Sequence, residues 1–154
     1  MKKLMFSLIC FLSLAVFAQD TKVINDANAT VRSLNGSFTA IQVSSGIKLF
    51  LTQGNEESIA VSATEKKYQD RIITEVENGT LKIYYDNKGI TWKSDKRYLR
   101  AYVSFKTVEK LNASAGSDVT VNGSINTDKL DLDVSSGAGF KGDIQAKEIV
   151  AAVS

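Results

Sequence analysis

Aromatic side chains that could bind a ligand are concentrated in one part of the chain. Four of the five tyrosines and the single tryptophan lie within nineteen positions, as Tyr84, Tyr85, Trp92, Tyr98 and Tyr102. A flat apolar ring with a polar tip suits an amphipathic partner such as a sugar. The candidate ligand surface is Tyr84, Trp92, Tyr98 and Tyr102. The competing interpretation, which we favour, is that Tyr85 and Trp92 fill the core beside a hairpin and cover one end of the fold.

Carboxylates near glycine turns raise the question of calcium binding, because oxygen ligands in such turns are what this ion needs. The residues concerned are Asp118, Asp131, Asp133 and Asp143. The repeat described below places no two of them in the same column, unlike the repeats of calcium-binding coils. We therefore predict a solvated acidic face, and neither a metal nor another cofactor.

Charged residues of the types used by polysaccharide-cleaving β-helix enzymes lie between positions 86 and 97. They are Asp86, Lys88, Lys93, Asp95 and Arg97. Glycoside hydrolysis needs two carboxylates at a defined separation, which a sequence does not give, and an ordinary charged loop explains the same residues. The chain also has no histidine, the most frequent general acid or base. We predict that the protein has no catalytic residues and is not an enzyme.

Residues 1–18 predict export from a bacterial cell. Lys2 and Lys3 precede an apolar run from Leu4 to Phe17, and Val16-Phe17-Ala18 comes directly before the polar Gln19-Asp20. This is the pattern of a cleaved signal peptide. The run is shorter than the roughly 20 apolar residues of a spanning helix, so we expect no stable membrane insertion after cleavage. The expected location is the periplasm, the cell surface or the extracellular space.

Cleavage after Ala18 changes the charge and the chemistry of the chain. The 19 basic residues fall to 17 when Lys2 and Lys3 leave, and all 17 acidic residues stay, so the net charge is 17 − 17 = 0. A neutral chain gives no electrostatic reason to expect nucleic acid as a partner. Cys10 also leaves, and it is the only cysteine. Disulfides, thiolate catalysis and the usual zinc or copper sites are therefore excluded.

Most of the remaining chain alternates apolar and polar residues, the period of β-strands with one buried face. Segments with this pattern are 41–44, 47–52, 59–63 and 98–106. Phe50 breaks the alternation, which suggests that its side of the strand is covered too. Asn78-Gly79 predicts a type I′ hairpin turn, because both central residues of that turn need positive φ. Only 65–71 could form a helical turn, with Thr64 as its N-cap.

The last part of the chain repeats itself with a period of 19–21 residues, which indicates stacked rungs. Leu111, Leu132 and Ala151 should form one inward column, and Ala113, Val134 and Val153 another. The outward columns should be Asn112, Asp133 and Ala152, and Ser114, Ser135 and Ser154. Ile125 should lie beside Ile144, and Leu130 beside Ile149. Alanine after Asp133 and valine after Asp131 avoid repulsion between stacked carboxylates. Gly116 and Gly137 should form corners. Val43–Gly46 has the same sequence as Val134–Gly137, so it should belong to the same repeat.

Three blocks in order, residues 37–54, 75–83 and the Ser/Ala-Gly rungs, resemble the auto-transporter adhesin head GIN domain family, a DUF2807-type domain of secreted Bacteroidetes proteins. The resemblance runs from about Phe38 to the end. It implies a right-handed, mostly parallel β-helix with a surface or adhesion role, and it supplies no catalytic residues. Members continue through further rungs, so the chain is expected to be C-terminally truncated, with the strand at 149–154 exposed.

The sequence therefore predicts an all-β protein. Its fold should be a right-handed parallel β-solenoid with rungs of 19–21 residues and one hairpin insertion. The expected parts are a signal peptide at 1–18, a polar lead-in at 19–36 and an incomplete solenoid domain at 37–154. The expected function is a secreted, non-enzymatic adhesion or cell-envelope role with an unknown glycan or protein partner. The alternatives are a carbohydrate-binding module that uses the aromatic residues and, third, a polysaccharide-degrading enzyme.

Overall fold

The protein is described by a computed structural model that covers residues 25–90 and 96–154. The expected signal peptide at 1–18 and the side chains of Trp92, Lys93 and Asp95 lie outside these residues. The strands are β1 (Thr30–Arg32), β2 (Ala40–Val43), β3 (Lys48–Gln53), β4 (Ser58–Ser62), β5 (Ile72–Glu77), β6 (Thr80–Tyr85), β7 (Arg100–Phe105), β8 (Lys110–Ala113), β9 (Asp118–Val134) and β10 (Gly139–Val153). A single helical turn, α1 (Lys66–Gln69), separates β4 from β5.

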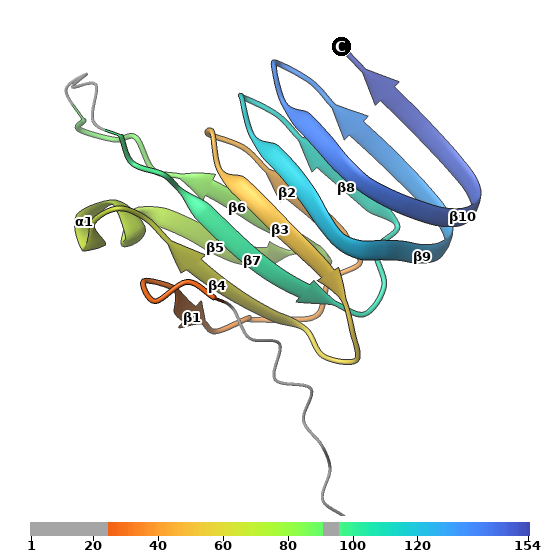
Figure 1. Ribbon diagram of the computed structural model, residues 1–154, viewed down its shortest axis with the longest axis horizontal. Helices are drawn as coiled ribbons and strands as arrows, with labels where there is room; N and C mark the ends of the chain where they lie inside the picture. The colour runs from red at the N-terminus through yellow and green to blue at the C-terminus, as the bar shows by residue number, and fades with distance from the viewer. Residues whose placement is uncertain (1–24, 91–95) are drawn as a thin grey trace, which may run out of the picture.

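All strands belong to one sheet in the order β1-β4-β7-β3-β9-β8-β2-β6-β5, with β10 added on β9. The first part of β9 pairs with β3 and its last part with β8, so this strand bends from one wall of the molecule to the other. β10 follows β9 around the same bend (Figure 1). The sheet consequently nearly closes, like a barrel, around a core of inward-facing side chains.

The all-β class is confirmed, but the sheet is mixed and not a wholly parallel coil. β2, β3 and β6 to β10 are joined by parallel pairs. The pairs β1–β4, β4–β7 and β5–β6 are antiparallel. The antiparallel pairs gather at the end of the molecule opposite β10 (Figure 1). Two regions can therefore be distinguished, a regular end (β8 to β10) and an irregular end (β1, β4 to β7 and α1).

The predicted columns of the regular end are confirmed by the strand register. Leu111 pairs with Leu132, which pairs with Ala151, and Ala113, Val134 and Val153 follow in the same way. The outward pairs Asn112–Asp133, Asp133–Ala152 and Asp131–Val150 are also observed, as are Ile125–Ile144 and Leu130–Ile149. Backbone amides of Ser135 and Ser154 donate to the carbonyls of Ala113 and Val134, which continues the serine column.

The corners of successive rungs share one backbone conformation. Gly46, Gly116 and Gly137 have φ values of 71°, 71° and 76°. The residues before them, Ser45, Ala115 and Ser136, also have positive φ. The Gly46 amide donates to the Ala115 carbonyl at 3.0 Å, and the Gly116 amide to the Ser136 carbonyl at 3.1 Å, so the corners stack. Glycine suits the second position because it adopts positive φ without steric cost. The repeated sequence at Val43–Gly46 thus forms a corner in the same stack, as predicted.

The core is formed by the inward side chains of both walls. Its largest fully buried members include Phe38, Phe105, Ile41, Leu49 and Leu111. Phe50 points outward from β3, where its ring stacks on Tyr102 of β7 with centroids 5.2 Å apart and planes 14° apart. The break in alternation at Phe50 therefore marks a covered outer position, as the sequence suggested.

The predicted hairpin is formed by β5 and β6, with Asn78 and Gly79 at φ 50° and 73°. It is not an insertion, because β6 also pairs in parallel with β2 and so continues the main sheet. The predicted cap of the helical turn is wrong by one residue. Glu65 is the N-cap of α1, while the Thr64 hydroxyl donates to the carbonyls of Lys96 and Arg97.

The outer edge of β10 has no partner strand among the described residues. Ile149, Val150 and Val153 are 47%, 48% and 80% exposed. Ala151 and Val153 extend the inward columns but are exposed, since no further rung covers them in the described part of the chain. The last strand is thus exposed, as the sequence predicted.

Candidate functional site

The tyrosines of the predicted ligand surface do not lie together. Tyr84 faces outward from β6, and Tyr102 faces outward from β7, and four strands separate β6 from β7 in the sheet order. Tyr98 precedes β7 and is 53% exposed. Tyr85 is buried in the core at 3% exposure, which confirms its predicted core position. The structure thus brings Tyr102 to Phe50, and places Tyr84 on the opposite wall.

The aspartates considered for calcium are also dispersed. The Asp131 carboxylate lies 4.0 Å from the Lys110 ammonium, and Asp133 accepts a hydrogen bond from the Asn112 amide at 3.2 Å. Asp118 and Asp143 are exposed at other positions along β9 and β10. Among residues 25–90 and 96–154, no three His, Cys, Asp or Glu side chains are grouped as a metal site requires.

Of the charged side chains considered between positions 86 and 97, Arg97 makes a contact within the irregular end. Its guanidinium lies over the ring of Tyr85, 5.1 Å from the ring centroid. A cation over an aromatic face is attracted by the ring quadrupole. Asp86 and Lys88 are held through their backbone, because the Arg71 guanidinium donates to their carbonyls at 3.2 and 2.8 Å. These contacts have a structural role at one end of the sheet.

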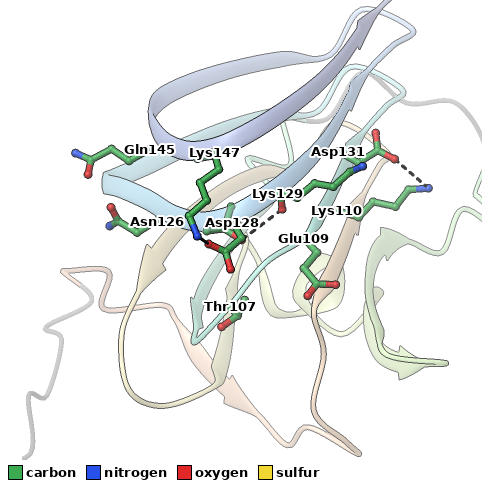
Figure 2. Close-up of a pocket in the computed structure, with 11 residues that line it drawn as sticks. Thr107, Glu109, Lys110, Asn126, Asp128, Lys129, Asp131, Gln145 and Lys147 are labelled. Carbon is green, nitrogen blue, oxygen red and sulfur yellow. Dashed lines mark hydrogen bonds and ion pairs between the residues drawn. The ribbon is translucent and has the colours of Figure 1, made fainter.

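An open polar groove of about 1170 Å³ lies where β9 and β10 bend. We call it the corner groove, and its lining is Thr107, Glu109, Lys110, Asn126, Thr127, Asp128, Lys129, Asp131, Gln145, Ala146 and Lys147. Figure 2 shows Lys147 of β10 directed toward Asp128 of β9, where the two side chains are 2.7 Å apart. The groove is thus lined by three successive strands, β8, β9 and β10, and by charged side chains that pair between them.

The charges of the corner groove are balanced. Three acidic residues (Glu109, Asp128, Asp131) face three lysines (Lys110, Lys129, Lys147). Lys129 also contacts Glu148 at 2.8 Å, and this hydrogen bond and charge raise the pKa of Lys129 above its ordinary value. All these side chains are largely exposed, and such pairs contribute little to stability. They are therefore available to exchange their partners for polar groups of a ligand.

A smaller hollow of about 370 Å³ lies on the wall formed by β2 and β6, beside Tyr84. We call it the Tyr84 slot, and its lining is Gln42, Ser44, Ser45, Glu75, Lys82, Ile83 and Tyr84. The Tyr84 hydroxyl lies 3.2 Å from a Glu75 carboxylate oxygen, to which it donates. Burial and this hydrogen bond raise the pKa of Tyr84, so the phenol is neutral at physiological pH.

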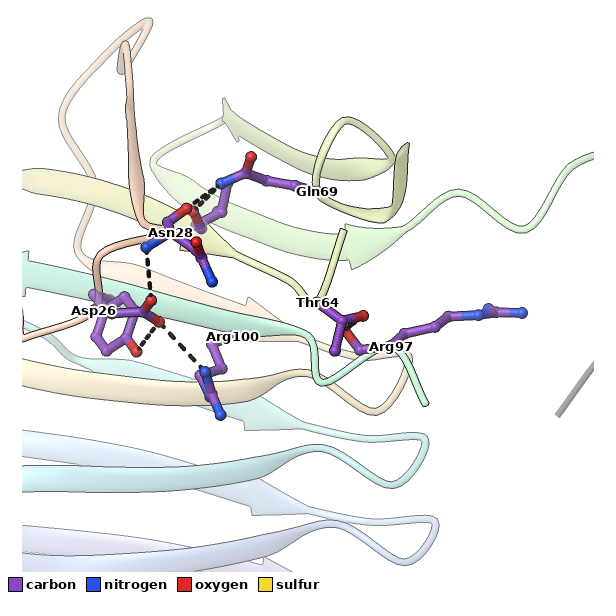
Figure 3. A network of polar contacts seen from close by, with 8 residues as sticks. Asp26, Asn28, Thr64, Gln69, Arg97 and Arg100 are labelled. Carbon is purple, nitrogen blue, oxygen red and sulfur yellow. Dashed lines mark hydrogen bonds and ion pairs between the residues drawn. The ribbon is translucent and has the colours of Figure 1, made fainter. Parts of the chain in front are cut away.

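A network of polar contacts fastens the segment 25–32 to the irregular end (Figure 3). The Asp26 side chain is only 9% exposed and accepts hydrogen bonds from the Tyr102 hydroxyl at 2.7 Å, the Asn28 amide at 3.0 Å and Arg100 at 3.4 Å. Burial raises the pKa of Asp26, but these contacts outweigh it and hold the pKa below its ordinary value. Burial and the bond to Asp26 raise the pKa of Tyr102 to about 12.

Gln69 of α1 completes this network. Its side-chain amide donates to the carbonyls of Asn28 and Val61 at 2.7 and 2.8 Å and to the Thr30 hydroxyl at 3.1 Å. Arg32 in turn donates to the Gln69 carbonyl at 3.0 Å. A single buried side chain thus joins β1, β4 and α1, and the network has a structural role.

Comparison with known proteins places the chain in a family. The family model described as "Putative auto-transporter adhesin, head GIN domain" (DUF2807) matches residues 37–154. The chain belongs to this family. The head GIN domain of this chain has no match among curated proteins. Within its described residues, no helix is long and apolar enough to cross a bilayer.

Solved structures share the fold at low sequence identity. A "putative adhesin" from Parabacteroides merdae has a TM-score of 0.65 and 14% identity, over 83% of this chain and 53% of that one. A "putative adhesin" from Bacteroides fragilis has a TM-score of 0.62 and 15% identity, over 84% of this chain and 78% of that one. A "putative lipid binding protein" from Parabacteroides distasonis has a TM-score of 0.55 and 17% identity, over 82% of this chain and 61% of that one. This head GIN chain thus spans less than two thirds of two of these three structures, and the likeness concerns the fold alone.

Sequence reasoning missed the residues that complete the irregular end of this head GIN domain. Asp26 lies in what was predicted as a polar lead-in, and Gln69 in a stretch expected only to form a helical turn. The contacts that fasten the segment are not signalled locally, because Tyr102 lies 76 positions from Asp26 and Asn28 lies 41 positions from Gln69. Phe50 did carry a signal, the break in alternation, but not the identity of its partner Tyr102.

Proposed function

We propose that this head GIN domain is a secreted, non-enzymatic adhesion module that works at the bacterial cell surface or in the periplasm. Its scaffold would be a right-handed β-solenoid, extended at one end by the antiparallel strands. The family and the adhesin-like folds of the solved structures support an adhesion role. The signal-peptide pattern of residues 1–18 supports export.

The corner groove is the observation that carries this proposal. It is open, it is formed by consecutive rungs, and its lining is polar and balanced in charge. Adhesion needs a rigid surface that exchanges its own polar contacts for those of a partner, and exposed ion pairs do so at small cost. A balanced surface does not favour a polyanion, so nucleic acid is not the expected partner. The partner would be a glycan or protein of the cell envelope or its surroundings.

A bead assay tests this role with the full chain. Beads coated with the protein are incubated with bacterial envelope preparations, immobilised glycans and extracellular matrix proteins, and saturable retention is expected on at least one of them. A double variant, Lys129→Glu with Lys147→Glu, should lower that retention without changing the melting temperature, whereas Lys66→Glu, on the exposed α1, should not. Absence of saturable retention on every surface would contradict the proposal.

The carbohydrate-binding alternative keeps support from one observation, the Tyr84 slot, since that slot combines an aromatic ring with amide, hydroxyl and carboxylate groups. The enzyme alternative has no such support among the described residues. Incubation of the protein with polysaccharides separates the two alternatives. Retention of intact chains favours a binding module, and release of shortened chains favours an enzyme.

A further inference from the structure

The Tyr84 slot has a shape set by the strand register. On β6, the outward neighbours of Tyr84 are Ile73 of β5 on one side and Ser44, just after β2, on the other. Ser44 is small, and its amide donates to the carbonyl of Ile83 at 3.1 Å, which fixes it beside the ring. The hollow above Ser44 and Ser45 is consequently bounded by Tyr84 on one side.

The polar groups around this hollow are those that sugars use. Gln42 is exposed and lines the hollow, as do Ser44 and Ser45, whose hydroxyl oxygens are 3.4 Å apart. The Glu75 carboxylate accepts a hydrogen bond from the Tyr84 hydroxyl, and this bond restricts the orientation of the ring. An aromatic ring with a few placed hydroxyl, amide and carboxylate groups fits a ligand that has an apolar face and a polar rim.

Beyond the slot, the strand register continues its rows of small and polar residues onto the neighbouring strands. Next to Ser44 come Ser114 and Ser135, and next to Gln42 come Asn112 and Asp133. Asn112 donates to Asp133 at 3.2 Å, so these groups already form a polar row. Adjacent rungs are about 4.8 Å apart. A chain molecule could therefore lie across several rungs, with one unit beside Tyr84.

The charges that face this path argue against an acidic ligand. Glu75, Glu77, Asp131 and Asp133 are acidic, and Lys82 and Lys110 are basic, among the outward positions of β2, β5, β6, β8 and residues 131–134 of β9. Lys82 is also paired with Glu77. The path is thus net negative, which repels carboxylate and sulfate groups. A neutral chain pays no such electrostatic penalty.

We propose that the Tyr84 slot binds one ring of a neutral glycan, which stacks on Tyr84 while the glycan chain runs across Ser44, Ser114 and Ser135. This inference rests on the proposed adhesion function and names the class of its partner. It places this glycan contact on the wall of β2 and β6, as a second contact surface apart from Tyr102, Tyr98 and the corner groove.

The test uses the full chain on an array of neutral and acidic oligosaccharides, followed by titration with the best neutral binder. Tyr84→Ala should weaken binding about tenfold or more, as loss of an aromatic contact does. Tyr84→Phe should keep most of the affinity, because the ring remains. Ser44→Leu should fill the slot and abolish binding. Because Ser44 lies outside the core, this substitution should leave the fold intact. Tyr98→Ala, at an exposed tyrosine elsewhere, is the matched control and should bind normally.

The outcomes separate this inference from the adhesion proposal. Neutral-glycan binding that survives both Tyr84→Ala and Ser44→Leu would place the site elsewhere and overturn the inference, while adhesion would stand. Binding to acidic glycans alone would overturn the class of ligand. Retention on protein surfaces with a silent array would overturn the slot but not adhesion. Unchanged melting of the Ser44→Leu variant ensures that its loss of binding is not a loss of folding.

Discussion

The two ends of the sheet are built in different ways. At the regular end, residues 19 to 21 positions apart lie side by side, and the same few columns recur from rung to rung. At the irregular end, antiparallel strands and α1 are joined by individual side chains such as Asp26 and Gln69, whose partners are distant in sequence. The regular end is therefore stabilised by the same contacts in every rung, and the irregular end by individual polar contacts, each of which occurs once among the described residues.

The largest effect is expected from a cavity in an inward column. Leu111 is fully buried, and it packs in the column with Leu132. Leu111→Ala should lower the free energy of unfolding by about 2–5 kcal/mol, because buried apolar contacts are lost and a cavity remains. Urea unfolding followed by circular dichroism measures this. A loss no larger than that of an exposed substitution would mean that the columns do not carry the stability of the regular end.

The next effect is expected at the irregular end. Gln69→Ala removes the side-chain NH2 group, whose two hydrogens are shared among three acceptors, and leaves the buried Val61 carbonyl without this donor. The loss should cost about 1–3 kcal/mol. Gln53 is the matched control, since its amide also bridges two carbonyls, those of Lys106 and Asn126, but in an exposed setting. Gln53→Ala should cost less in the same urea experiment. Equal losses would contradict the contrast between the buried and exposed amides.

A smaller effect is expected from pH at the Asp26–Tyr102 contact. The folded pKa of Asp26 lies below its ordinary value of 3.8, so its contribution is present above that value and is lost as the pH falls through the folded pKa. The pKa of Tyr102 is raised to about 12, so its contribution is present below pH 10 and is lost as the pH rises toward 12.

Asp26→Asn should therefore destabilise the protein at pH 7, and the difference from the unaltered chain should shrink in acid. Tyr102→Phe should weaken the alkaline loss of stability. Melting temperatures recorded from pH 2.5 to 11 measure both changes. If the difference in melting temperature between Asp26→Asn and the unaltered chain did not change with pH, the ionised carboxylate would be excluded as the source of the stabilisation.

The smallest effect is expected in the corner groove. Lys129→Ala removes an exposed ion pair with Glu148, so the midpoint of urea unfolding should not change measurably. The same variant should still alter retention in the bead assay if the groove is the contact surface. A clear drop in the urea midpoint would show that the groove is structural.

The sequence predicted the regular end well because its information is local and repeated. Alternation placed Leu111 and Ala113 inward, and the period of the repeat then placed Leu132, Val134 and their neighbours beside them. The Asn78-Gly79 turn was predicted for a comparable reason, since two adjacent residues decide it.

The irregular end and the candidate surfaces were predicted less well, because they depend on contacts between distant segments. Nothing near Asp26 indicates that it accepts a hydrogen bond from Tyr102, and nothing near Tyr84 indicates that Ser44 leaves space beside it. The aromatic residues are close in sequence, yet the crossing from β6 to β7 places Tyr84 and Tyr102 on different walls. Proximity along the chain was thus a poor guide to a shared surface.

The parallel register of β9 and β10 has a mechanical consequence. The hydrogen bonds between them are directed along the stack, from one rung to the next. A force that pulls the rungs apart opens these bonds from one edge in succession, whereas a force along the strands loads the whole ladder in shear at once. In the proposed adhesion role, the domain would therefore resist tension best when the load runs along its strands, and the position of the partner contact would determine the direction of that load.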